Sequence, residues 1–277
     1  MLDLSQRGEL SLHSEVAAAV VHVLTQSGMA GIVVGAFARD LHLHYGAGVP
    51  QQRRTEDVDF AFAIDTWAAF DALKRRLIES GAFRAVEGNQ HRLVHANGIK
   101  IDLVPFGSIE RSDRTIAWPP TGDTIMDVYG FQESLASSEQ VLLPGNVKIH
   151  IVSLAALALL KIIAWHDRHQ RAPRKDAADL NLIFRNYLAL PDNKERFWND
   201  FSEWAESEDF DYEDSGARML GHDIRRLIGA PGLAKLDEIL KAQIEQSDVA
   251  KLPREMDGHS PERAHALLKS LYRGLVP

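Results

Sequence analysis

The chain has 277 residues, 45% of them hydrophobic and 25% charged, which is the composition of a globular protein long enough for two modest cores. It contains no cysteine, and this excludes a disulfide framework, a thiolate zinc site and a catalytic thiol. The net charge of −8 argues against a protein that is held on nucleic acid chiefly by neutralising phosphates.

The first predicted elements surround a turn of small residues. A helix is expected over residues 14–28, followed by a strand over 31–35 and a helix over 36–45. Gly35 and Ala36 form the turn, where the backbone can approach a ligand closely and the N–H groups of the next helix attract phosphate. The plain alternative is a turn that only connects a strand to a helix.

The next strand, expected over residues 57–64, carries Asp57 and Asp59 after a polar loop over 46–54. Residues i and i+2 of a strand point to the same face, so the two carboxylates should project side by side. Close carboxylates repel each other, and divalent cations between them relieve the repulsion and favour phosphate chemistry. The alternative is a pair of solvated acids at the start of a surface strand.

A third acid follows in a hairpin. Thr66 is expected to cap a helix over residues 67–80, and strands follow near 83–87, 91–95 and 100–104. Asp102 lies among apolar residues of the last strand, where a carboxylate is costly unless it is paired or bound to a metal. The alternative for Asp102 is a cross-strand ion pair, and Arg92 on the preceding strand could make that pair or contact phosphate.

The second half of the chain reads as helix. Residues 105–150 are rich in loops, with a small hairpin near 139–149. Helices are expected over residues 153–168, 175–188, 193–206, 214–228, 231–245 and 260–274. The sequence thus predicts an α+β chain, in which a mixed sheet flanked by helices occupies residues 1–150 and an all-helical domain occupies residues 151–277.

Two of these helices carry a second group of charged residues. Lys161 and Arg168 share one face of the helix over 153–168, and Asp176 and Asp179 share a face of the next. Two plain alternatives apply. The Lys161 stem could pack while its ammonium reaches water, and Asp176 could be a helix N-cap.

The order of these motifs resembles the nucleotidyltransferase superfamily that includes DNA polymerase beta. The run from Lys161 to Asp179 is similar to the AbiEii/AbiGii-type toxin nucleotidyltransferases of bacteria. The resemblance implies that Asp57, Asp59 and Asp102 are catalytic and hold two Mg²⁺ ions, with Mn²⁺ as an alternative, around a nucleoside triphosphate. It also implies that Gly35 and Ala36 grip the phosphates. The family usually has Gly or Ser where this chain has Ala36, which predicts a weaker grip.

The resemblance further implies a catalytic domain over residues 1–150 and a helical domain over 151–277 that completes the nucleotide pocket. Lys161 and Asp176 would be catalytic, with Lys161 also on the nucleotide, and Arg39 and Arg54 are predicted as further nucleotide-binding residues. The predicted reaction moves a nucleotide from an NTP to an acceptor hydroxyl of RNA, such as tRNA, or of a protein.

The biology that the resemblance implies is the toxin of a bacterial toxin–antitoxin or phage-defence system, with a cognate antitoxin as partner. The main alternative is a catalytically weak or inactive nucleotide-binding module of the same fold. A two-metal hydrolase is a second alternative. A third, an antitoxin or DNA-binding protein, is disfavoured by the acidity of the chain and by the absence of a recognisable recognition helix.

No targeting or membrane segment is expected. Residues 1–7 do not begin a basic segment followed by an apolar core, and the longest apolar run, residues 154–164, is too short for a bilayer. With no cysteine in the chain, these observations predict a cytoplasmic protein without membrane contact.

Overall fold

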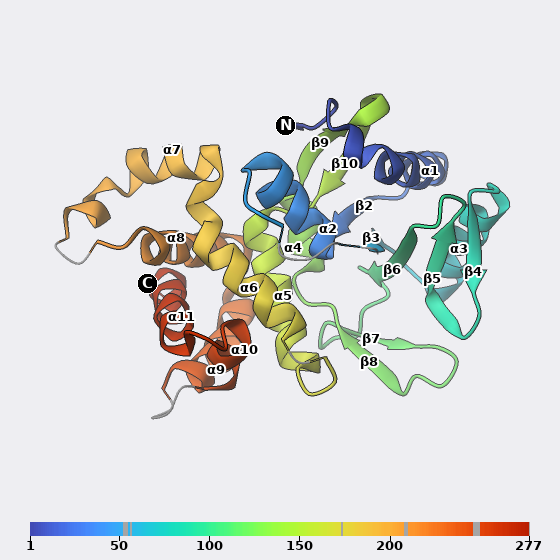
Figure 1. The fold of residues 1–277 in the computed structure, drawn as a ribbon. Coiled ribbons are helices and arrows are strands. Elements are labelled where there is room, and N and C mark those ends of the chain that lie inside the picture. The colour runs from blue at the N-terminus through green and yellow to red at the C-terminus, as the bar shows by residue number, and fades with distance from the viewer. Residues whose placement is uncertain (52–54, 56, 173, 208–209, 246–249, 277) are drawn as a thin grey trace. The chain divides into compact units, whose positions relative to one another are not determined.

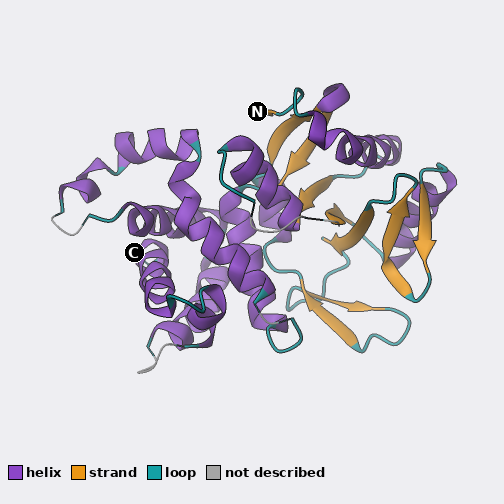
Figure 2. Ribbon diagram, in the orientation of Figure 1, coloured by secondary structure: helices purple, strands orange, loops and turns teal. Residues whose placement is uncertain are grey.

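The computed structural model describes residues 1–51, 55, 57–172, 174–207, 210–245 and 250–276. The chain packs into two compact units, which we call the sheet unit (residues 1–41 and 51–153) and the helical unit (residues 42–50 and 154–277). The helical unit thus takes in residues 42–50, which were predicted to belong to the first domain. Strands lie in the sheet unit and helices in both, so the predicted α+β class is confirmed (Figures 1 and 2).

The sheet unit is built on a mixed sheet. Among the described residues, eight strands pair in the order β1-β9-β10-β2-β3-β6-β5-β4. They are β1 (Leu2–Asp3), β2 (Gly31–Val34), β3 (Asp57–Ala63), β4 (Phe83–Val86), β5 (Asn89–His95), β6 (Lys100–Phe106), β9 (Glu139–Leu143) and β10 (Val147–Ile151). The central strand β3 is antiparallel to β2 and parallel to β6. A separate hairpin, β7 (Thr115–Trp118) and β8 (Thr124–Asp127), was not predicted from sequence.

Alternation along β3 divides the sheet into a packed face and a polar face. Val58, Phe60 and Phe62 are buried, whereas Asp57 and Asp59 are half-buried. A methyl group built at Gly31 would touch both the Phe62 ring and Leu24 of α1 (Ser11–Ser27). Helix α1 therefore covers the apolar face, and the two acids lie on the other face.

The remaining helices of the sheet unit are α2 (Gly35–Asp40), α3 (Trp67–Glu79) and α4 (Phe131–Ala136). The predicted cap of α3 is confirmed, because Thr66 Oγ1 accepts a hydrogen bond from the Ala69 N–H at 3.2 Å. The predicted helix over 36–45 is α-helical only as far as Asp40 and continues as a π-helical turn, Leu41–Gly46. The predicted hairpin is also confirmed, because β5 and β6 pair antiparallel and Gly98 between them has φ +94°.

The helical unit contains α5 (Leu154–Arg168), α6 (Lys175–Asn186), α7 (Pro191–Asp200), α8 (Tyr212–Leu227), α9 (Ala230–Ile244), α10 (Lys251–Met256) and α11 (Pro261–Leu275). The short α10 was not predicted. Helices α8 and α11 approach closely at two glycines, because a methyl group at Gly221 would overlap the Leu271 carbonyl oxygen and one at Gly274 would overlap that of Arg218. Within the described ranges, no helix has the length and apolar character needed to cross a membrane.

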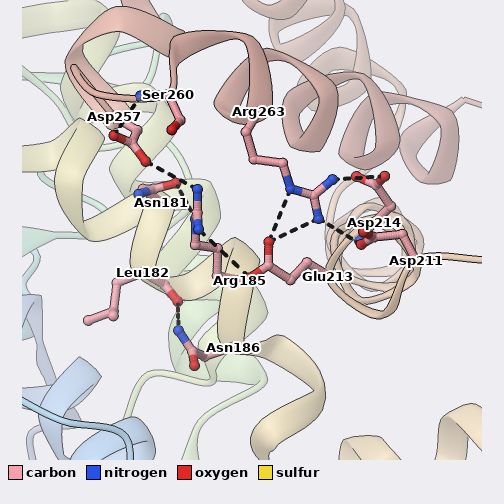
Figure 3. Close-up of polar contacts among 10 residues, drawn as sticks. All are labelled: Asn181, Leu182, Arg185, Asn186, Asp211, Glu213, Asp214, Asp257, Ser260 and Arg263. Carbon is pink, nitrogen blue, oxygen red and sulfur yellow. Dashed lines mark hydrogen bonds and ion pairs between the residues drawn. The ribbon is translucent and has the colours of Figure 1, made fainter.

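Ion pairs join several elements of the helical unit. Arg263 of α11 bonds Asp211, Glu213 and Asp214 at the start of α8, at 2.6, 2.9 and 3.1 Å (Figure 3). Arg185 of α6 lies 3.1 Å from Asp257, which follows α10. These contacts fix how the ends of the helices meet around the apolar core.

Candidate active site

Strand register brings the three predicted acids together on one face of the sheet. Asp59 of β3 is the direct partner of Asp102 of β6, and Asp57 lies two residues before Asp59 on the same face. Neighbouring strands lie roughly 5 Å apart, so the three backbone positions are adjacent. The sequence left open which face of the sheet carries Asp102, and the register of β6 against β3 places it on the face of Asp57 and Asp59.

The turn of small residues lies against the acid pair. Gly35 begins α2 with φ +72°, and a methyl group built there would overlap Asp59 Oδ2 and lie 2.8 Å from its Cγ. Val34, the preceding residue, is the register partner of Asp59. A side chain at position 35 would therefore displace the Asp59 carboxylate, which ties the turn directly to the acids.

Arg92 of β5 bridges two of the acids. Its Nε and Nη2 donate to Asp102 Oδ1 and Oδ2, both at 2.6 Å, and Nη2 lies 3.5 Å from Asp57 Oδ2. The hydrogen bond to Asp102 and the charges of the three acids raise the pKa of Arg92 above its usual value, against the opposing effect of burial. Of the two alternatives for Arg92, the cross-strand pair is thus the one observed.

The donor set suits a hard divalent cation, because Mg²⁺ and Mn²⁺ prefer carboxylate oxygens. As arranged, no three His, Cys, Asp or Glu side chains among the described residues are placed to hold an ion. The guanidinium of Arg92 occupies both oxygens of Asp102 in this arrangement. Since the backbone positions are already adjacent, rotation of side chains is enough to change the distances between the carboxylates. Asp57, Asp59 and Asp102 therefore suit a divalent cation in their chemistry, and their backbone positions are neighbours on the two strands.

Arg39, predicted to bind nucleotide, lies in a buried ion pair. Its side chain is 3% exposed, and its Nε donates to Asp40 Oδ1 at 2.9 Å. The other oxygen of Asp40 accepts hydrogen bonds from Gln51 at 2.8 Å and from Thr55 at 2.7 Å. Nucleotide binding by Arg39 stays a prediction. Arg54 lies outside the described residues.

Lys161 and Asp176 belong to the helical unit, where they form one buried charge cluster. Lys161 Nζ lies 3.0 Å from Asp176 Oδ1 and 2.6 Å from Asp179 Oδ2, and Arg168 Nε donates to Asp176 Oδ2 at 2.8 Å. The Lys161 side chain is 7% exposed, so the alternative in which its ammonium reaches water is wrong. Asp176 is the second residue of α6 and Arg174 is the N-cap, so the capping alternative is also wrong.

In this cluster, opposite charges offset the effect of burial on the pKa values of Lys161 and Asp176. Burial by itself would lower the pKa of the Lys161 ammonium, but Asp179 and Asp176 outweigh it and the pKa lies above its usual value. Burial would raise the pKa of the Asp176 carboxyl, but Arg168 and Lys161 hold it below its usual value. The ion pairs therefore lock α5 to α6.

Two acids that bind the predicted cations were given no role on the basis of the sequence. Asp40 gathers Arg39, Gln51 and Thr55, and the only sequence signal was its position directly after Arg39. Asp179 was placed on the face of Asp176 but was given no role, although its i,i+3 spacing already put it within reach of the same cation.

Comparison with known proteins identifies the family. The family model described as "Nucleotidyl transferase AbiEii toxin, Type IV TA system" matches residues 30–269. No curated protein matches. One similar solved structure is the antibiotic-resistance factor ANT(2'')-Ia, 10% identical, with 71% of this chain and 96% of that chain covered and a TM-score of 0.40. Another is an antigenic nucleotidyltransferase-like protein from Paracoccidioides brasiliensis, 18% identical, with 73% and 93% covered and a TM-score of 0.40.

The structural similarities are loose at these TM-scores, whereas the family match spans most of the chain. The predicted resemblance is thereby confirmed. The protein belongs to the AbiEii nucleotidyl transferase toxin family and is a nucleotidyltransferase.

Proposed function

We propose that this nucleotidyltransferase uses divalent metal ions held by Asp57, Asp59 and Asp102 to move a nucleotide from an NTP to an acceptor hydroxyl. The observation that carries the proposal is the register of β3 and β6, which pairs Asp59 with Asp102 on the face that also bears Asp57. Three acids at neighbouring backbone positions repel one another, and a divalent cation bound between them would offset that repulsion, which supports the proposal.

The metal ions, when bound, orient the triphosphate and stabilise charge on the entering and leaving oxygens. The protein residues have separate tasks. Asp57 and Asp59 provide carboxylate oxygens at fixed positions, and Asp102 favours the deprotonated form of the acceptor hydroxyl. Gly35 and Ala36 steady the phosphates through backbone N–H groups, and the close approach of Gly35 to Asp59 supports this placement.

Lys161 and Asp176 enter the proposal through the family resemblance. We propose that Lys161 is catalytic and that Asp176 orients it, a role that the 3.0 Å contact between them supports. Nucleotide binding by Lys161, Arg39 and Arg54 belongs to the same proposal and rests on the same resemblance.

We further propose that the acceptor is an RNA such as tRNA, or a protein hydroxyl, and that the protein acts as a toxin in the cytoplasm beside a cognate antitoxin. The family description, which names a toxin of a type IV toxin–antitoxin system, supports the toxin and the antitoxin. Mg²⁺, with Mn²⁺ as an alternative, is the proposed metal because the donor set is carboxylate alone.

The test is incubation of the protein with each labelled NTP, Mg²⁺ and total RNA, followed by gel separation. Asp59→Asn should abolish label transfer, because it removes one of the adjacent carboxylates and leaves the shape of the side chain. Asp65→Asn is the matched control, since Asp65 is an exposed acid just beyond the end of β3. Wild-type transfer by Asp59→Asn would refute the metal assignment. Magnesium-dependent stabilisation by NTP without pyrophosphate release would favour the binding module instead.

A further inference from the structure

Arg92 continues the row of charged residues across the sheet. It is the register partner of Asp102 on β6, and Asp102 is the register partner of Asp59 on β3. Three neighbouring strands therefore place one guanidinium and two acids in line, with Asp57 one residue pair further along the same face. Arg92 contacts both Asp102 and Asp57, and Lys100 of β6 is the register partner of Asp57.

The contact between Arg92 and Asp102 uses the atoms that a metal ion needs. Both oxygens of Asp102 accept hydrogen bonds from Arg92 at 2.6 Å, in the two-pronged geometry that guanidinium groups form with carboxylates. A cation that binds Asp102 must share or replace those bonds. Solvent reaches this contact, because the side chains of Arg92 and Asp57 are 29% and 30% exposed and that of Asp102 is 14% exposed.

The effect of the Arg92 charge depends on whether a metal ion is bound. With no metal ion, Arg92 offsets the repulsion among the three carboxylates and holds Asp102 in place. With a metal ion bound, the same guanidinium becomes a like charge beside it and competes for the same oxygens. The arginine thus stabilises the metal-free site and opposes the loading of that site.

We propose that Arg92 is a displaceable counter-ion of the active site, which occupies Asp102 in the metal-free protein and sets the affinity for the divalent cation. The inference rests on the proposed metal-binding role of Asp57, Asp59 and Asp102. It adds that the protein carries its own competitor for the metal, so that a higher concentration of free cation is needed to fill the site.

The test is titration of the full chain with Mn²⁺ by isothermal calorimetry, without nucleotide. Arg92→Gln should bind Mn²⁺ about tenfold more tightly than wild type, since a hydrogen bond to a charged group contributes the free energy of about that factor. Arg92→Lys should fall between them, because an ammonium keeps the charge but cannot make both bonds. Arg84→Gln is the matched control. Arg84 is an exposed arginine of β4 with Val94 as its register partner, so Arg84→Gln should bind Mn²⁺ as wild type does.

The outcomes separate this inference from the proposed function. Equal or weaker Mn²⁺ binding by Arg92→Gln, in a protein whose binding falls with Asp59→Asn, would overturn the inference and leave the function standing. Binding that Asp59→Asn does not change would overturn the metal site itself. If Arg92→Gln is unfolded without metal, recovery of its thermal transition by Mn²⁺ would support the inference. If Mn²⁺ does not restore the thermal transition of Arg92→Gln, the test is made with Arg92→Lys. The inference is then overturned unless Arg92→Lys binds Mn²⁺ more tightly than wild type.

Discussion

Replacing Gly35 with alanine tests whether the turn between β2 and α2 positions the acid pair. Two separate costs are expected. The backbone of Gly35 is left-handed, at φ +72°, and the added methyl group would overlap Asp59 Oδ2 and lie 2.8 Å from its Cγ. The first cost falls on the backbone alone, and the second forces the Asp59 carboxylate to move.

Each cost has a magnitude. A left-handed conformation costs a non-glycine residue about 1–2 kcal/mol. Relief of the overlap adds about 1–3 kcal/mol, as is usual when an extra methyl group enters a packed site. A catalytic group displaced by about 1 Å can lower the rate ~10²-fold. Gly35→Ala should therefore lower the free energy of unfolding by about 2–5 kcal/mol and the rate of nucleotidyl transfer by at least ~10²-fold.

The assay combines urea denaturation with transfer of labelled NTP. Gly81→Ala is the matched control, because Gly81 has φ +76° and no atom lies within 4 Å of a methyl group built there. It should lose only the backbone contribution, about 1–2 kcal/mol, and keep its activity. If Gly35→Ala matched Gly81→Ala in stability and wild type in rate, the turn would have no part in placing Asp59.

Three further predictions concern stability. The folded-state pKa of Asp176 lies below its usual value of 3.8, because Arg168 and Lys161 outweigh the effect of burial. The contribution of Asp176 to stability is therefore present above pH 3.8 and is lost as pH falls through the folded-state pKa. In urea unfolding measured between pH 3 and 7, Asp176→Asn should therefore show a smaller loss of stability towards acid pH, which we call the acid limb, than wild type. Gly274→Ala should destabilise the protein by ~3 kcal/mol or more in urea denaturation, because its methyl group would overlap the backbone of α8. Thr66→Ala should lose about 1 kcal/mol with the cap of α3, measured by thermal denaturation, and leave transfer unchanged.

Each of these predictions has a comparison that can contradict it. An equal change of the acid limb in Asp176→Asn and in Asp192→Asn, at an exposed acid of α7, would show that the cluster is not its source. Gly258→Ala should be tolerated, since its nearest new contact is 3.8 Å away, and equal losses at 258 and 274 would contradict the close packing of α8 and α11. A loss of transfer in Thr66→Ala would show that the start of α3 affects the acids.

The sequence alone determined what depends on neighbouring residues. Asp57 and Asp59 share a face because side chains alternate along any strand, and Thr66 caps α3 because its hydroxyl reaches an N–H three residues on. The long helices of the second half were visible as apolar periodicity. The short α10 was not, because six residues with a proline among them carry too little pattern.

Only the tertiary structure decided which charges meet. Whether Asp102 faced the acid pair depended on the register of β6 against β3, two strands about forty residues apart in sequence, and a shift of one residue would have turned it away. Lys161 could have reached water or been buried, and the packing of α5 on α6 buried it between Asp176 and Asp179. Charged residues that lie far apart in sequence meet only when the packing of the whole core brings their elements together. No single segment of the sequence contains that information.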